Sequence, residues 1–215
     1  MDYSEWLPIY REIAEDLDIS MAEDRASARK LEKKLTKKPN LKKLEKTVKE
    51  KTIVLGDAPT LQKEIKKIKH ETDIKTVIAA DNATKTALEH NITPDIVTTD
   101  LDGDINSILE ADKKGAITIV HAHGDNQQLI EKWTPQIKNI IGSTQNQPTD
   151  KLINYGGFTD GDRAIYIAHE FGAREIHLIG FDYEKAEKNK KKKLKWAEKL
   201  INNLKTKGVK ITSQK

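Results

Sequence analysis

From Thr52 onward, short apolar runs alternate with segments of helical periodicity, and this alternation restricts the possible folds more than any other feature of the sequence. The apolar runs span residues 52–55, 75–80, 95–99, 116–120, 138–141, 175–179 and 209–212. Helical patterns fill most of the gaps, at residues 61–68, 84–90, 105–113, 127–133, 162–171 and 186–205. Strands that alternate with helices form parallel sheets covered on both faces. We therefore predict an α/β fold with a mainly parallel, Rossmann-like sheet and helices on both faces.

The first fifty residues show helical periodicity and almost no strand signal. Apolar residues recur every four positions, as in Ile9, Ile13 and Leu17, which is typical of an amphipathic helix. The pair Pro39-Asn40 interrupts the pattern, because proline cannot continue a helix. We predict two or three helices over residues 1–50 that pack on the core, followed by an α/β domain over residues 51–215.

The composition excludes several classes of function. The chain has no cysteine, so disulfides, thiolate zinc sites and cysteine nucleophiles are ruled out. Its apolar runs are too short to cross a bilayer. The N-terminus lacks the basic and apolar regions of a secretory signal. We therefore expect a cytoplasmic protein without membrane partners.

Lysines are concentrated in two stretches of the chain. The net charge is +4, and ten lysines lie between Lys30 and Lys51 and seven between Lys185 and Lys195. No aromatic residues are interleaved with them as a stacking platform for nucleic acid would require. The pattern favours solvated helix faces over a nucleic-acid partner.

Acidic and other polar residues follow five of the predicted strands. They lie at residues 56–57, 81–82, 100–104, 121–126 and 181–182. In open α/β sheets, ligands bind at the carboxyl ends of the strands. One Asp after a strand is commonly a helix N-cap, but five such segments at one edge indicate a ligand site.

A divalent cation would relieve the repulsion between carboxylates at this edge. Asp100 and Asp102 lie on alternate sides of the turn after a strand. They can share a Mg²⁺ that keeps several waters and binds substrate phosphates. Asp125, one strand over, is the predicted third carboxylate. The sequence therefore predicts a magnesium site.

The segment from Gly156 to Arg163 combines glycines with a basic residue. Gly156, Gly157 and Gly161 allow positive φ and close approach of the backbone to a ligand. Arg163 lies at a predicted helix start, where its planar fork can hold a phosphate bidentately and the helix N-terminus adds N–H groups. The alternative interpretation is a tight turn with Asp160 or Asp162 as the N-cap.

Four motifs resemble, in their order and spacing, those of the archaeal 6-hydroxymethyl-7,8-dihydropterin diphosphokinases. They are AADNATK at 79–85, TPDIVTTDLDGD at 93–104, HAHGDN at 121–126 and GGFTDGDRA at 156–164. That family is similar in fold to thiamin pyrophosphokinases, whose Gly-Asp-x-Asp-Ser turn corresponds to residues 99–103. The resemblance implies Mg²⁺-dependent transfer of a diphosphate from ATP to the pterin's hydroxymethyl group, with AMP as the other product. The pathway would be methanopterin or folate biosynthesis.

One turn departs from the family pattern. The first-strand turn of the family usually reads Gly-x-Gly-Pro-Ser-Leu, whereas this chain has GDAPTL at 56–61. Ala58 adds a methyl group and Asp57 adds negative charge, so a phosphate or substrate role for residues 56–60 has less support than the other assignments. A homodimer is expected by analogy with thiamin pyrophosphokinases.

The resemblance also implies roles for individual residues. The residues expected to act in catalysis are Asp100, Asp102, Asp125 and Arg163, of which the three Asp also hold Mg²⁺. The residues expected near the nucleotide phosphates are His123, Asn126, Gly156, Gly157, Thr159, Gly161, Asp162 and Arg163. The residues expected near the pterin are Asp81, Asn82, Phe158, Asp160 and Asp182. Either Asp125 or Asp160 would accept the alcohol proton, and either Asp81 or Asp182 would bind the guanidine-like edge of the pterin.

Three other functions fit parts of the sequence. A phosphatase of the haloacid dehalogenase type would use the turn 100–103, but that motif normally follows the first strand and continues with Thr. A metal-dependent hydrolase would use His121, His123 and Asp125, but Asn126 replaces the final His of its motif. An RNA-binding module would rest on lysine alone. No P-loop, dinucleotide-binding or serine-nucleophile motif is present.

Overall fold

A computed structural model describes residues 1–68, 76–183 and 188–213. Its helices are α1 (Tyr3–Asp16), α2 (Met21–Lys34), α3 (Leu41–Thr47), α4 (Leu61–Ile68), α5 (Ala83–Glu89), α6 (Ile105–Lys113), α7 (Gln127–Trp133), the 3₁₀ turn η1 (Thr134–Gln136), α8 (Asp160–Glu170) and α9 (Lys188–Thr206). Its strands are β1 (Lys51–Leu55), β2 (Thr76–Ala80), β3 (Ile96–Thr99), β4 (Ile117–Ala122), β5 (Ile140–Thr144), β6 (Leu152–Ile153), β7 (Glu175–Ile179) and β8 (Lys210–Ser213).

The strands form one sheet in the order β6-β5-β4-β3-β2-β1-β7-β8, and every pairing is parallel. The predicted parallel α/β fold is confirmed. The sequence missed β6, because two residues are too few to show a strand pattern. Lys75 at the predicted start of β2, and Ala186 at that of α9, lie outside the described residues.

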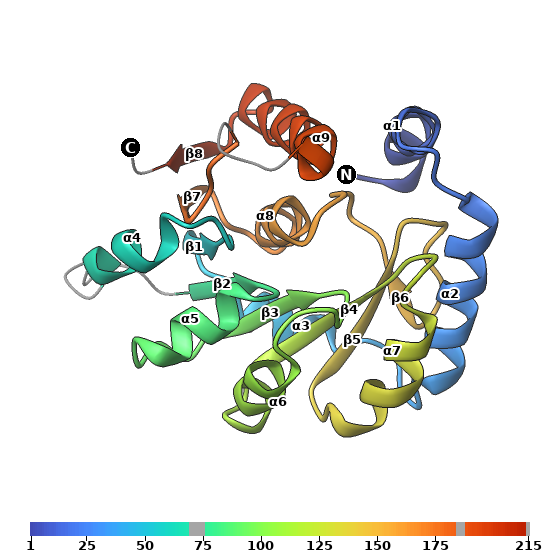
Figure 1. Cartoon of the computed structure of the whole chain (residues 1–215), viewed down its shortest axis with the longest axis horizontal. Helices are drawn as coiled ribbons and strands as arrows, with labels where there is room; N and C mark the ends of the chain where they lie inside the picture. Colours follow the sequence, from blue (N-terminus) through green and yellow to red (C-terminus); the bar gives the residue numbers. More distant parts are fainter. Residues whose placement is uncertain (69–75, 184–187, 214–215) are drawn as a thin grey trace.

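Helices cover both faces of the sheet (Figure 1). The helix α8 lies between the sheet and the helices α9 and α1 on one face, whereas α5 and α6 lie on the other. The connection from the edge strand β6 to β7 must cross most of the sheet, and α8 in this connection packs against β1, β2 and β3. This crossing brings the start of α8 to the centre of the sheet.

The N-terminal helices pack into the hydrophobic core of the α/β domain. Trp6 and Tyr10 of α1 are buried with α8, α9 and the sheet, and the indole Nε1 of Trp6 donates to the carbonyl of Gln145 at 2.9 Å. The helix α2 packs beside α7 and β5 (Figure 1). The Pro39-Asn40 break separates α2 from α3, with Asn40 as the N-cap of α3. Three helices thus occupy the segment where two or three were predicted.

No helix in the described part of the chain is long and apolar enough to cross a membrane.

Candidate active site

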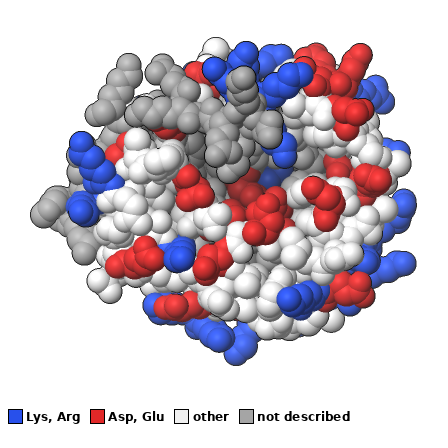
Figure 2. All heavy atoms as spheres, in the orientation of Figure 1, with Lys and Arg blue, Asp and Glu red and all other residues white. Residues whose placement is uncertain are grey.

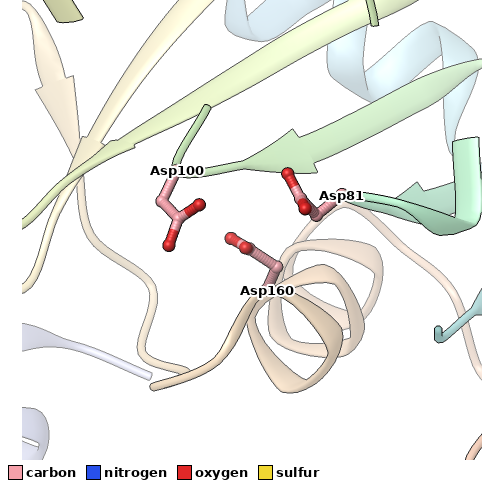
Figure 3. Close-up of side chains that lie close together, drawn as sticks. All are labelled: Asp81, Asp100 and Asp160. Carbon is pink, nitrogen blue, oxygen red and sulfur yellow. The ribbon is translucent and has the colours of Figure 1, made fainter. Parts of the chain in front are cut away.

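Three aspartates from separate elements point toward one another at the carboxyl edge of the sheet (Figure 3). Asp81 follows β2, Asp100 follows β3, and Asp160 begins α8. Their carboxylate oxygens all lie within 4.8 Å of one another. Oxygen ligands at this separation suit a hard divalent cation such as Mg²⁺. We call these three residues the carboxylate cluster.

The turns that carry the cluster have an unusual backbone. Asp81 has φ of 45° and Leu101 has φ of 73°, a region that costs free energy for residues other than glycine. The hydroxyl of Thr99 accepts a hydrogen bond from the Leu101 N–H at 2.8 Å and donates to Asp81 Oδ1 at 2.6 Å. A Cβ at Gly103 would lie 2.1 Å from Asp81 Oδ2. The turn after β3 therefore holds the Asp81 carboxylate in place.

The electrostatics of the cluster show that its negative charges oppose one another. Burial, together with the charge of Asp100, raises the pKa of Asp81 to about 6 and that of Asp102 to about 7. Burial and the same charge raise the pKa of Asp160 well above its usual range. Burial also acts on Asp100, but its hydrogen bonds with His123 and Asp102 hold its pKa below the usual range. A bound divalent cation would stabilise all four carboxylates in their charged form.

The predicted metal ligands divide into two groups. Asp100 belongs to the carboxylate cluster, and Asp102 is hydrogen-bonded to it. Asp125, whose side chain is 89% exposed, is instead 2.5 Å from Nδ1 of His123. The other ring nitrogen, Nε2, lies 3.0 Å from Asp100 Oδ2. Asp125 thus reaches the cluster through His123, while Asp81 and Asp160, predicted as pterin contacts, share the cluster with Asp100.

Asn126, predicted to contact phosphate, is a buried structural junction. Its Nδ2 donates to the carbonyls of Asp100 at 2.9 Å and His121 at 2.7 Å. Its Oδ1 accepts from the His123 N–H at 3.1 Å and from the Ser27 hydroxyl at 3.0 Å. The side chain therefore joins α2, the loop after β4 and the backbone of Asp100.

We expect Asn126→Ala to lower the free energy of unfolding by about 3 kcal/mol, because it leaves several buried partners without hydrogen bonds. For a chain of this size the melting temperature should fall by roughly 6–12 °C. Thermal unfolding followed by circular dichroism measures this. The control Ser27→Ala removes one of these bonds and should cost about 1 kcal/mol. Equal, small losses in both variants would contradict the role of Asn126 as a junction.

The glycine-rich loop before α8 is closed by its own side chains. Asp162 is fully buried and accepts hydrogen bonds from the backbone N–H of Phe158 and Thr159, and from the Thr159 hydroxyl. Thr159 is the N-cap of α8. These contacts are those of a capping box, so the side chain of Asp162 is used in closing the loop.

Arg163 is buried behind this loop and not at its surface. Its side chain is 4% exposed, and NH1 lies 3.2 Å from Asp160 Oδ1. NH2 donates to the carbonyls of Phe158 at 3.0 Å and Gly157 at 3.4 Å. A Cβ at Gly157, whose φ is +88°, would lie 2.4 Å from the Arg163 Cα. Arg163 therefore fixes Asp160 and the loop, in contrast to the predicted grip on a phosphate.

The remaining predicted residues differ in how deeply they are buried and in what they contact. Phe158 is buried in the main core. The Oδ1 of Asn82 accepts from the Asp104 N–H at 2.9 Å and so holds the turn after β3. Asp182 is half-buried just beyond β7, and Gly156, with φ of 89°, has its N–H bonded to Asn154.

One aromatic residue that we did not predict belongs to this edge. A Cβ at Gly56 or at Gly161 would lie 2.9 Å from the Phe181 ring. The ring thus separates the turn after β1 from the start of α8. Its position directly after a strand was the available signal, which an aromatic side chain makes hard to distinguish from core packing.

The fold and the site together are those of an α/β protein whose sheet edge can hold a divalent cation. Figure 2 shows acidic atoms gathered around a hollow near the middle of the displayed face.

His121 is buried and does not belong to this acidic surface. Its Nδ1 lies 3.0 Å from the hydroxyl of Ser143. Burial, with the nearby charge of Arg163, lowers the pKa of His121 well below its usual range.

Comparison with known proteins identifies the family. Residues 27–188 match the family described as 6-hydroxymethylpterin diphosphokinase MptE-like. The chain is 40% identical to a 6-hydroxymethyl-7,8-dihydropterin pyrophosphokinase of Pyrococcus furiosus, over 97% of this chain and 96% of that one. It is 36% identical to the protein of the same name from Methanothermobacter thermautotrophicus, over 97% of each chain. This protein therefore belongs to the MptE-like 6-hydroxymethylpterin diphosphokinase family, which confirms the resemblance seen in its motifs.

A solved structure of a probable thiamine pyrophosphokinase from Staphylococcus saprophyticus aligns with 76% of this chain and 64% of its own. The sequence identity is 18% and the TM-score is 0.42. A similarity of this size carries no weight for the function of the chain.

Proposed function

We propose that this protein transfers a diphosphate from ATP to the hydroxymethyl group of 6-hydroxymethyl-7,8-dihydropterin, with Mg²⁺ as cofactor and AMP as the other product. The observation that carries the proposal is the carboxylate cluster of Asp81, Asp100 and Asp160 at the sheet edge, in a chain of this family. Transfer of phosphoryl groups depends mainly on positioning and on stabilisation of negative charge. The cluster is suited to hold the cation that such a reaction uses.

The residues present fit a Mg²⁺ ion. The cluster offers hard oxygen ligands. Burial, together with the charge of Asp100, raises the pKa of Asp81 and of Asp160, and a bound cation would oppose both effects. Asp100, Asp81 and Asp160 would hold the ion, with Asp102 beside them. When bound, Mg²⁺ neutralises the phosphate oxygens of the nucleotide. Arg163 keeps Asp160 in place from behind through its ion pair.

The chain offers two further groups for the reaction. The N-terminus of α8 begins at the cluster, where its positive dipole end favours a phosphate group. Of the two carboxylates predicted as proton acceptors, Asp160 is held by Arg163, whereas Asp125 is exposed and contacts His123. We therefore assign the acceptance of the alcohol proton to Asp125.

The alternative functions find no support in the geometry. Among the described residues, His121, His123 and Asp125 do not come close enough together to share one metal ion, whereas Asp81, Asp100 and Asp160 do. The turn 100–103 follows the third strand of the chain, where the phosphatase motif would follow the first.

The product pattern tests the proposed reaction. In a diphosphokinase the alcohol attacks the β-phosphorus of ATP, so one turnover should yield AMP and a diphosphorylated pterin in equal amounts. Separation of nucleotides and mass analysis of the pterin measure both products. ADP with a monophosphorylated pterin, or phosphate released without the pterin alcohol, would rule out the assignment.

The metal ligands can be tested apart from catalysis. Mg²⁺ at about 100 times its dissociation constant should stabilise the wild-type protein by roughly 2.7 kcal/mol, or about 5–10 °C in melting temperature. We expect Asp81→Asn and Asp100→Asn to abolish most of this shift and Asp125→Asn to preserve it, because Asp125 lies outside the cluster. Thermal unfolding with and without Mg²⁺ measures the difference. Loss of the shift in both Asp100→Asn and Asp125→Asn, with the shift preserved in Asp81→Asn, would instead support the ligand set predicted from the sequence.

A further inference from the structure

A cavity lies at the end of the sheet opposite the carboxylate cluster. It has a volume of about 550 Å³ and lies between the end of α2, the start of α3, and the residues that lead into β4 and β5. Small-molecule sites typically have volumes of about 300–1,000 Å³. We call it the basal cavity, because it is bordered by Ile117 and Ile140, which begin β4 and β5.

The polar wall of the basal cavity is strongly basic. Five lysines line it: Lys34, Lys37, Lys38, Lys43 and Lys138. No Asp or Glu of the described residues is among the lining side chains. Four of the five lysines belong to the lysine-rich stretch between Lys30 and Lys51, which the proposed active site does not use. Part of this lysine-rich stretch therefore lines a cavity, and the stretch is more than a solvated helix face.

Only part of this positive charge is balanced. Lys38 lies 2.8 Å from Asp150, and Lys34 lies 3.7 Å from Glu131. Lys43 Nζ instead contacts uncharged oxygens, at 3.1 Å from Asn139 Oδ1 and 3.5 Å from the Gly115 carbonyl. Within the described residues, no carboxylate forms an ion pair with Lys37, Lys43 or Lys138. The buried carboxylate of Asp112 also lies close to the cavity, where it accepts from the backbone N–H groups of Lys138 and Asn139 at 2.9 and 2.8 Å. The five lysines still leave an excess of positive charge, which suits a phosphate or diphosphate group.

The floor of the basal cavity is apolar. Ile117, Ile137 and Ile141 line it and are buried, with exposed fractions of 2%, 6% and 3%. Lysines near a helix C-terminus also suit the helix dipole, but only Lys34 of the five lies in the last turn of a helix at this place. A basic wall over an apolar floor is suited to a ligand with a flat apolar body and an anionic group.

We propose that the basal cavity is a second binding site, for a small molecule whose apolar ring system carries a phosphate or diphosphate group. The charge and size of the cavity favour such a ligand over a nucleic acid strand, which would need a continuous basic groove with aromatic platforms. The site is separate from the carboxylate cluster, because it opens at the other end of the strands. It does not depend on the proposed reaction.

The test is a titration with 1-naphthyl phosphate, without Mg²⁺, on protein labelled at the isoleucine δ1 methyl groups. Nuclear magnetic resonance should show saturable shifts of Ile137 and Ile141. The triple variant Lys37→Gln, Lys43→Gln, Lys138→Gln should bind at least about tenfold more weakly, because three charge contacts are lost while glutamine keeps a donor at each position. The matched control Lys33→Gln, Lys42→Gln, Lys46→Gln removes the same charge from exposed lysines outside the cavity and should bind like the wild type.

Three outcomes would overturn the proposal. Absence of shifts at Ile137 and Ile141 would mean that the cavity does not take the probe. Equal weakening in both triple variants would mean that the overall charge attracts the probe and that no specific site exists. Equally strong binding of uncharged 1-naphthol would mean that the lysines recognise no anion. Each result is independent of turnover at the carboxylate cluster.

Discussion

We expect Asp100→Asn to reduce turnover by roughly a hundredfold to a thousandfold, the range seen when one strong electrostatic contact is removed from an active site. Asp100 is the member of the cluster whose pKa is held low, so it is the carboxylate that stays charged without a cation. The thermal stability measured without Mg²⁺ should change little, because the substitution relieves repulsion with Asp81, Asp102 and Asp160 but also removes the interaction of the charged Asp100 with His123. Steady-state kinetics at saturating Mg²⁺ and thermal unfolding measure both effects.

Asp95→Asn is the matched control for this change. Asp100 follows β3 directly, and Asp95 directly precedes it at the other end of the strand. There the Oδ2 of Asp95 accepts a hydrogen bond from the Val77 N–H at 2.8 Å. Asparagine can still accept that bond, so turnover should stay near the wild-type value. Near-normal turnover in Asp100→Asn would remove Asp100 from the reaction, and a large loss in both variants would point to a general effect on the fold.

We expect Arg163→Met to lower the free energy of unfolding by about 3–5 kcal/mol, the cost of breaking a buried ion pair by removing one partner. The melting temperature should fall by roughly 6–20 °C. Methionine fills similar space but cannot donate to Asp160 or to the carbonyls of Gly157 and Phe158. Protonation of Asp160 offsets part of this cost, because burial already raises its pKa. Chemical denaturation monitored by circular dichroism gives the value.

The control for Arg163→Met is the same substitution at Arg174, an exposed arginine just after α8. Its cost should stay within about 0.5 kcal/mol. The free energy of unfolding of Arg163→Lys should lie between those of the wild type and Arg163→Met, because lysine keeps the charge but lacks the planar guanidinium group. A stable Arg163→Met protein that has lost ATP binding would support the phosphate contact predicted from the sequence. It would contradict a structural role for the buried contacts of Arg163 with Asp160 and the loop carbonyls.

The ligand contacts predicted for individual residues depended on which side chains of a motif face the ligand. The sequence of a motif does not specify the direction in which each side chain points. HAHGDN at 121–126 and GGFTDGDRA at 156–164 were singled out as ligand-binding segments, and the structure brings both to the carboxylate cluster, through His123 and Asp160. Within them, however, Asn126, Asp162 and Arg163 direct their polar atoms at backbone groups of the loops themselves. A polar residue in a ligand-binding loop can bind the ligand or close the loop, and the residue types needed for the two tasks overlap.

The sequence by itself determined the parallel α/β fold, the sheet edge that carries the candidate site, and the family. Alternating strand and helix patterns leave few arrangements other than a parallel sheet, and parallel strands necessarily bring their carboxyl ends to one edge. Only the tertiary structure decided that Asp160 joins Asp81 and Asp100. Asp160 follows Asp100 by sixty residues, and their meeting depends on α8 crossing the sheet from the edge strand β6 to pack on β1, β2 and β3. Such a contact follows from long-range packing, for which local sequence patterns contain no signal.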